Sequence, residues 1–290
     1  MRLNLQKSFT RLFLISLIWL LLEGIFRKWL FFSLAGPLFY VKYLLFGLTY
    51  AAFLFNKYPI MRVKFVYHYL MVLFISMCFI GFLINKNDNP FIVGIIGLVV
   101  HLLFVPLIHL NQFMFVSMKG IKYFSNVITF IAFPICILGM VQFYLPTDHP
   151  INGFVNEEQL ITKVAGFTRI SSVFSFVKIF NAYLLFSVTF LTGVVLNKLL
   201  KGKPVIIESL AIFLLIINMF MTGSRLPVGL MLFNFLIIGI YVFMSFSNLR
   251  KTVVVVFMSG IISLVTLYFT TELFNDCLLY TSDAADEGHC

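Results

Sequence analysis

The chain has 290 residues, of which 61% are hydrophobic and only 11% charged, and its mean hydropathy is +1.03. These values exclude a soluble globular domain and a disordered chain, because too few polar side chains are present to solvate so many apolar ones. The formal net charge of +10 therefore acts as a signal of membrane orientation and gives no reason to expect nucleic acid as a partner. The composition predicts an all-α, polytopic bundle of transmembrane helices whose solvent is the lipid bilayer.

Apolar runs between charged residues predict about nine spans, since a membrane helix needs roughly 20 apolar residues. The predicted spans lie near residues 12–32, 37–55, 65–84, 91–110, 124–144, 173–196, 205–221, 226–246 and 253–271. The first run is not a cleavable signal peptide, because Glu23 follows it where a small-residue cleavage site would stand. We therefore expect this run to remain as an anchor.

Basic residues predict the orientation, because short loops rich in lysine and arginine stay on the cytoplasmic side. If the N-terminus is cytoplasmic, the inner ends hold most of the basic residues, namely Arg2, Lys7, Arg11, Lys57, Arg62, Lys64, Lys119, Lys122, Lys198, Lys201, Lys203, Arg250 and Lys251. The outer loops then hold fewer, namely Arg27, Lys28, Lys86, Lys163, Arg169 and Arg225. We expect a multi-pass protein with a cytoplasmic N-terminus and two outer segments of interest, the loop 146–170 and the turn 222–225.

The last fourteen residues, 277–290, differ from the rest of the chain. They read CLLYTSDAADEGHC, which resembles an in-frame translation of a transposase-end sequencing adapter. We exclude this tail from the fold as a sequence scar. The remainder, 1–276, is expected to be a single transmembrane domain and a fragment of a longer protein that continues past Asp276.

Three charged residues close the first span. Glu23 and Arg27 are four residues apart with the acid first, which places them on one helix face in the favoured order. Lys28 follows directly. One interpretation is an intrahelical ion pair with basic anchors that reach the interface; the other is that these charges support a ligand site.

The turn before the eighth span carries the arrangement most suited to an anion. In MTGSRLPVGLML, Ser224 is a good helix N-cap residue, and Thr222 and Arg225 flank it. The start of a helix already carries partial positive charge, so an arginine there is misplaced unless an anion binds. Backbone amides, both hydroxyls and the guanidinium would then converge on phosphate. An interfacial arginine paired with lipid headgroups is the alternative.

The sixth span repeats this pattern, because Arg169 precedes Ser171 at its outer end. Lys178 lies on the same helical face as Ser171 in this prediction, so we expect it inside the bundle, paired with Glu23 or with a ligand phosphate. Lys42, in the second span, either lines the same cavity or reaches the near interface.

Motifs of soluble enzymes are absent from the sequence: it has no P-loop, serine-hydrolase, zinc-protease or paired-cysteine pattern. The histidines occur singly, and we predict no metal and no cofactor. His149, in the outer loop beside Asp148, is a secondary candidate for a catalytic role.

Three stretches resemble the O-antigen ligase and polymerase superfamily of multi-span bacterial membrane proteins. EGIFRKWLF resembles a Glu-Gly-x-x-Arg-Lys-Trp pattern of one branch, TRISSVFSF resembles the Arg-x-Ser start of a middle span, and FMTGSRLPVGLML resembles a Thr-x-Ser-Arg turn. By span layout the likeness covers the whole of 1–276.

The resemblance implies a metal-independent glycosyltransferase of the cell envelope that acts in lipopolysaccharide or polysaccharide biosynthesis. Such an enzyme moves glycan from an undecaprenyl-diphosphate-linked donor at the periplasmic face of the bacterial inner membrane. Arg169 and Arg225 match positions that hold the diphosphate in that family. The family's catalytic loop would fall beyond the truncation, so the fragment is expected to be inactive and its catalytic residue is unknown. The alternative is a flippase or exporter of lipid-linked polysaccharide, which Glu208 near the inner end of the seventh span favours.

Overall fold

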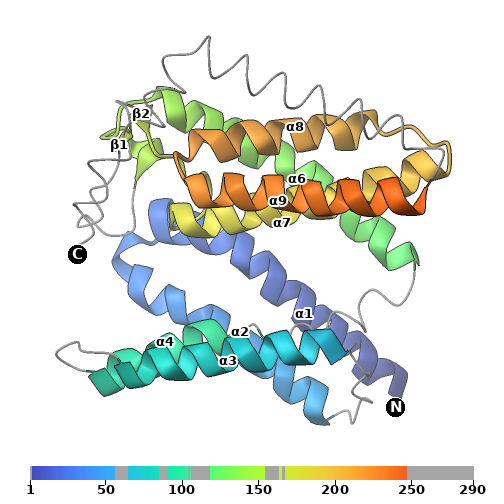
Figure 1. Cartoon of the computed structure of the whole chain (residues 1–290). Coiled ribbons are helices and arrows are strands. Elements are labelled where there is room, and N and C mark those ends of the chain that lie inside the picture. Colours follow the sequence, from blue (N-terminus) through green and yellow to red (C-terminus); the bar gives the residue numbers. More distant parts are fainter. Residues whose placement is uncertain are drawn as a thin grey trace. The chain divides into compact units, whose positions relative to one another are not determined.

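The computed structural model describes residues 2–55, 65–84, 90–103, 105, 118–153, 163–164 and 167–246 (Figure 1). Within these ranges the chain is almost entirely helical, which confirms the all-α prediction. The α-helices are α1 (Arg2–Ile25), α2 (Ala35–Phe55), α3 (Phe65–Ile84), α4 (Pro90–Leu102), α6 (Met118–Tyr144), α7 (Val177–Leu200), α8 (Ile206–Met221) and α9 (Arg225–Ser245). The predicted span 253–271 and the tail 277–290 lie outside the described residues.

Among the residues that the structure describes, four helical segments are long and apolar enough to cross a membrane. They are Phe32–Phe55, Ile121–Tyr144, Val177–Leu200 and Arg225–Ser245, and they overlap the predicted spans 37–55, 124–144, 173–196 and 226–246. The 16 residues of α8 are apolar but rise only about 24 Å, less than the roughly 30 Å of a hydrocarbon core. The protein therefore has the character of a membrane protein, and the count of nine spans stays a prediction.

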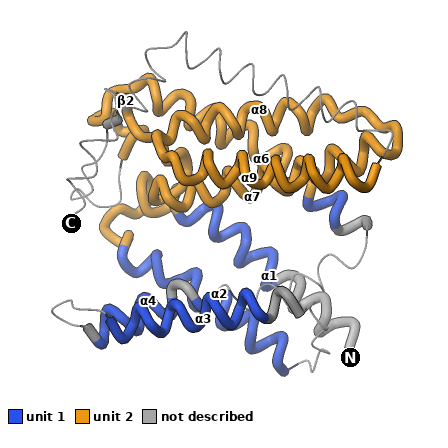
Figure 2. The backbone as a smooth tube through the Cα atoms, in the orientation of Figure 1, with its two compact units in different colours: residues 1–23, 36–124 blue, residues 24–35, 125–290 orange. Residues whose placement is uncertain are grey.

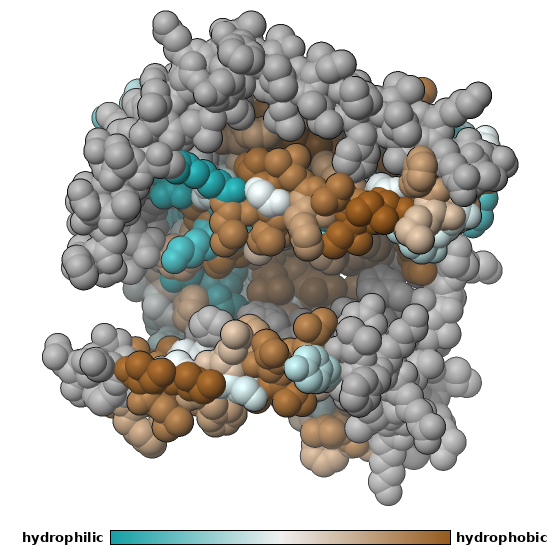
Figure 3. Space-filling view, viewed as in Figure 1, coloured by the Kyte–Doolittle hydropathy of each residue, from teal (hydrophilic) through white to brown (hydrophobic). Residues whose placement is uncertain are grey.

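Large apolar side chains cover the outer surfaces of the helices. Phe55, Leu226 and Met244 are among the most exposed of them, at 86%, 73% and 73%. Apolar side chains also follow α3 and α9 on the face shown in Figure 3. Water would not favour such surfaces, whereas lipid tails would.

The chain divides into two compact units, coloured separately in Figure 2. Unit 1 comprises residues 1–23 and 36–124. Within it, α3 packs against α4, and α1 meets α2 through polar side chains. The hydroxyls of Ser16 and Thr49 lie 3.1 Å apart and both residues are fully buried. Because each hydroxyl has few other partners in an apolar interior, this contact helps to fix how α1 and α2 align.

Unit 2 comprises residues 24–35 and 125–290. Here α7 packs against α8 and α9, and α8 also contacts α9. Gly139 on α6 faces Asn218 on α8 so closely that a Cβ atom would lie 2.1 Å from the Asn218 Oδ1 atom. A larger residue at position 139 would therefore displace the Asn218 side chain.

Short segments connect the longer helices of unit 2. A π-helix, η1 (Phe26–Leu30), and a 3-10 helix, η2 (Phe32–Leu34), follow α1, so the helix predicted to run to residue 32 is α-helical only as far as Ile25. A second 3-10 helix, η3 (Pro150–Asn152), lies between α6 and α7. Two strands of two residues each, β1 (Lys163–Val164) and β2 (Phe167–Thr168), pair in antiparallel fashion.

Gly24 lies where the end of α1 contacts the segment that leads into α7. A Cβ atom on Gly24 would lie 1.9 Å from the carbonyl oxygen of Val173. The end of α1 thus rests directly on the backbone of the segment that leads into α7, and only glycine permits this approach. The glycine of the EGIFRKW stretch therefore has a packing role.

We expect Gly24→Ala to lower the free energy of unfolding by about 1–3 kcal/mol, because the added methyl group must displace backbone atoms of Val173. The measurement is thermal unfolding of the purified chain in detergent. Gly47→Ala is the matched control, since a Cβ atom there meets nothing within 4 Å. Equal unfolding temperatures for the two variants would contradict the packing role.

Candidate functional site

A turn rich in serine leads into α7. We call Arg169–Phe176 the serine turn; its residues Ser171, Ser172 and Ser175 are buried at 4%, 0% and 4% exposure. The sequence predicts a helix from about residue 173, but α7 begins only at Val177. The helix starts late because side chains satisfy the backbone of the serine turn in a non-helical form.

Gln142, near the end of α6, supplies the central contact of this turn. Its Oε1 atom accepts a hydrogen bond from the Ser172 backbone amide at 2.7 Å, and its Nε2 atom donates to the Ser172 carbonyl at 3.3 Å. Ser172 has a φ of 48°, a left-handed conformation that non-glycine residues rarely adopt. Its hydroxyl also donates to the carbonyl of Ile135 at 2.7 Å. The turn is thus a strained, fully buried conformation that surrounding groups hold in place.

The sequence-based prediction did not include Gln142 or Asn152. The Nδ2 atom of Asn152 lies within hydrogen-bond distance of three carbonyls, one in the last turn of α6 and two just after it, and the shortest distance is 2.7 Å to Pro146. A glutamine near the end of an apolar run is a recognisable signal of such a role, because a buried amide in a membrane helix must find partners.

Lys28 points into the serine turn. Its ammonium donates to the Ser171 hydroxyl at 2.6 Å and to the Ser172 carbonyl at 3.0 Å. Lys28 is 6% exposed. It lies in η1, between α1 and the span that begins at Phe32, and burial lowers its pKa to about 7. The structure thus brings together two of the predicted site residues, Lys28 and Ser171.

Arg169 connects the serine turn to the turn before α9. Its Nε atom donates to the Thr222 carbonyl at 3.2 Å, and its Nη2 atom donates to the Ser224 hydroxyl at 3.0 Å. Burial lowers the pKa of this guanidinium from its usual value, yet arginine keeps its charge in proteins. Three residues predicted for one anion site, Arg169, Thr222 and Ser224, therefore meet in unit 2.

Arg225 behaves differently from Arg169. It is the first residue of α9, and its side chain is exposed. Ser224 occupies the N-cap position as predicted, but its side chain does not cap the helix; its hydroxyl accepts a hydrogen bond from Arg169 instead. Arg169 is thus in direct contact with this turn.

The prediction for Lys178 is wrong. We expected this residue inside the bundle and paired with Glu23 or a phosphate, whereas its side chain is exposed. The reason is the late start of α7: Lys178 is the second residue of that helix, and Ser171 lies before the helix on a different backbone conformation. The helical face that should have joined Ser171 and Lys178 does not exist.

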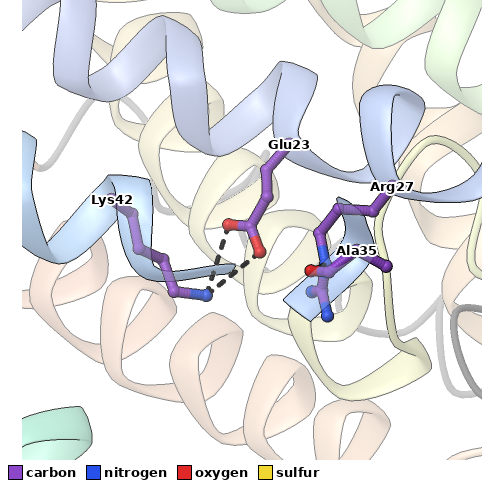
Figure 4. A network of polar contacts seen from close by, with 4 residues as sticks. All are labelled: Glu23, Arg27, Ala35 and Lys42. Carbon is purple, nitrogen blue, oxygen red and sulfur yellow. Dashed lines mark hydrogen bonds and ion pairs between the residues drawn. The ribbon is translucent and has the colours of Figure 1, made fainter. Parts of the chain in front are cut away.

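Glu23 pairs with Lys42 inside unit 1 (Figure 4). The Lys42 ammonium lies 3.2 Å from each carboxylate oxygen, and both side chains are almost completely buried. The ring of Phe39 adds a cation–π contact, with its centroid 3.7 Å from the ammonium. Of the two predictions for Lys42, the one in which it reaches the interface is therefore wrong.

Arg27 is held within unit 2. Its Nε atom donates to the Ala35 carbonyl at 2.8 Å, as Figure 4 shows, and its guanidinium lies 5.6 Å from the centroid of the Phe176 ring. Arg27 is 4% exposed, so its side chain does not extend to the lipid interface. It instead contacts the residue that follows η2 and the segment that leads into α7.

An apolar pocket of about 290 Å³ is lined in part by Trp29, the residue after Lys28. Its walls are Trp29, Leu138, Pro150 and Ile151. The indole Nε1 atom of Trp29 donates to the Pro150 carbonyl at 3.2 Å, and the Lys28 ammonium lies 5.7 Å from the centroid of the indole ring. A cationic contact and an apolar pocket thus share one tryptophan, which suits a ligand with an anionic part and an apolar part.

His149 has a structural contact in this region. Its Nδ1 atom accepts a hydrogen bond from the Ile151 backbone amide at 3.2 Å and so caps η3. Its proposed catalytic role stays a prediction. No group of three histidine, cysteine, aspartate or glutamate residues that could hold a metal ion occurs in the described ranges.

The chain matches no protein-family description, no curated protein and no solved structure.

We expect Lys42→Met to lower the free energy of unfolding by about 3–5 kcal/mol, because it leaves the buried Glu23 carboxylate without its cation. Lys201→Met is the control, since Lys201 is exposed and exposed charges contribute only about 0–1 kcal/mol. Thermal unfolding in detergent measures both variants. The double variant Glu23→Leu with Lys42→Met should recover much of the loss, and a double variant as unstable as Lys42→Met would contradict a charge effect.

Proposed function

We propose that this protein is a membrane glycosyltransferase of the O-antigen ligase or polymerase type. In this proposal it transfers glycan from an undecaprenyl-diphosphate-linked donor at the periplasmic face of the bacterial inner membrane. The observation that supports it is the contact of Arg169 with Thr222 and Ser224. These residues belong to two stretches that resemble this superfamily, TRISSVFSF and FMTGSRLPVGLML. Arg169 is 53 and 55 positions away from its two partners in the sequence, and the fold brings them together.

The chemistry of the contact fits a diphosphate. Glycosyl transfer from such a donor releases a diphosphate whose negative charge grows in the transition state, and fixed cations in a water-poor site stabilise that charge without a metal. Arg169 offers a planar guanidinium suited to phosphate oxygens. Lys28, buried against Ser171, supplies a second cation on the other side of the serine turn.

The predicted topology supports a periplasmic site. The hydrogen bonds of Gln142 to Ser172 and of Arg169 to Thr222 hold three segments together at one end of unit 2. The connection from α7 to α8 lies at the opposite ends of these helices and carries Lys201 and Lys203. With the basic connection in the cytoplasm, the serine turn faces the periplasm.

The alternative of a flippase or exporter depends on a polar path to the cytoplasmic side, for which Glu208 was the candidate. Glu208 is 6% exposed and forms an ion pair with Lys198. This pairing gives Glu208 a structural role at the α7–α8 connection, which removes the specific reason to favour transport.

The topology is tested with two single cysteines, Asp148→Cys and Lys201→Cys, in a chain whose own cysteines are replaced by alanine. Both positions are exposed and both belong to unit 2. We expect a membrane-impermeant maleimide to label position 148 from the periplasm and position 201 only after the membrane is opened. Labelling of position 148 only from the cytoplasm would overturn the periplasmic site.

The anion site is tested by binding of undecaprenyl diphosphate to the chain in lipid nanodiscs. We expect Arg169→Gln to weaken binding at least about tenfold, because it removes a charged donor from a partly buried contact. Lys201→Gln removes the same charge from an exposed position and should leave the affinity unchanged. Arg225→Ala should have a smaller effect than Arg169→Gln, and equal affinity of wild type and Arg169→Gln would remove the proposed role.

A further inference from the structure

Lys28 is a buried cation whose described partners are all neutral. They are the Ser171 hydroxyl, the Ser172 carbonyl and the indole ring of Trp29. No ion pair joins Lys28 to a carboxylate among the residues the structure describes. Glu23, five positions earlier, is held by Lys42. A buried ammonium without an anion is energetically costly, so this position is one that a bound anion would stabilise.

Lys28 and Arg169 make the same kind of contact. Lys28 donates to the Ser171 hydroxyl, and Arg169 donates to the Ser224 hydroxyl. A serine hydroxyl that accepts through its oxygen still has one proton to donate. Each pair therefore presents a hydroxyl donor backed by a positive charge, and such charge-assisted donors bind phosphate oxygens strongly.

We propose that Lys28 acts through Ser171 as a positioning residue of the diphosphate site and makes anion binding depend on its own protonation. This inference rests on the proposed function, because the anion is the diphosphate of the lipid-linked donor. Lys28 orients the Ser171 hydroxyl and supplies the charge behind it. Arg169 does the same for Ser224, with a charge that does not titrate.

The direction of the pH dependence follows from burial. Desolvation lowers the Lys28 pKa to about 7, and the other charged or titratable groups near it are Arg27 on η1, Arg169 on the serine turn and His149 beside η3. Arginine keeps its charge in proteins over this range. A bound anion favours the protonated amine, so affinity is highest below about pH 7 and decreases as the pH rises above it.

The experiment measures binding of inorganic diphosphate to the full chain in nanodiscs at about pH 6 and about pH 8.5. The variants are Lys28→Arg, Lys28→Gln and Ser171→Ala, and Ser175→Ala is the control because Ser175 is equally buried in the same turn. Diphosphate itself titrates in this range, but that effect is common to all variants. The ratio of wild-type affinity to Lys28→Arg affinity therefore isolates Lys28.

We expect this ratio to decrease about tenfold between the two pH values, since a charged hydrogen bond is lost. Lys28→Gln and Ser171→Ala should each weaken binding about tenfold at the lower pH, while Ser175→Ala binds as the wild type. Glutamine keeps a hydrogen-bond donor, so a purely structural Lys28 would leave the affinity of Lys28→Gln intact and overturn the inference.

The outcomes separate this inference from the proposed function. If Arg169→Gln weakens diphosphate binding while wild type and Lys28→Arg share one pH profile, the inference fails alone. If no chain binds diphosphate at either pH, both fail. If Lys28→Gln does not fold, the comparison of wild type with Lys28→Arg still tests the inference, because arginine keeps a long cationic side chain at position 28.

Discussion

The side-chain amide of Gln142 holds the backbone of Ser172 through both of its polar groups, and the candidate site depends on this interaction. A fully buried residue at a φ of 48° is stable only where its amide and carbonyl are satisfied, because an apolar interior offers no water to replace a missing partner. With Ser172 fixed, Ser171 lies within reach of Lys28, and Arg169 lies within reach of Thr222 and Ser224.

Close backbone contacts supply the second constraint. Gly24 lets the end of α1 rest on the Val173 carbonyl, and Gly139 lets α6 approach Asn218 on α8. In a lipid solvent the hydrophobic effect does not drive helices together, so such small-residue contacts and hydrogen bonds carry much of the specificity. The glycine and the lysine of EGIFRKW both belong to the surroundings of one turn, which explains in physical terms why they occur together in this stretch.

Buried charges among the described residues have two kinds of partner. In unit 1, Glu23 and Lys42 form an ion pair, and the Lys42 ammonium lies over the ring of Phe39, an arrangement that suits stability. In unit 2, Lys28 and Arg169 donate to hydroxyls and carbonyls of neutral residues. Cations whose hydrogen-bond partners are neutral groups can still bind an anion.

Composition and the length of the apolar runs determined the helical class, the membrane character and four of the spans, because these depend on local hydrophobicity and on the thickness of a bilayer. The sequence placed Arg169 with Ser171 at one helix start and Arg225 with Thr222 and Ser224 at another, and only the fold showed that Arg169 contacts Thr222 and Ser224. Helical periodicity gave the wrong orientation for Lys178, because it assumes a continuous helix. It cannot detect a turn that is held by a glutamine about 30 residues away. Only the tertiary structure decided that Lys28 reaches Ser171 across 143 residues and that Glu23 belongs to Lys42. Partners of buried charges are set by packing between distant segments, and no local pattern in a sequence encodes that packing.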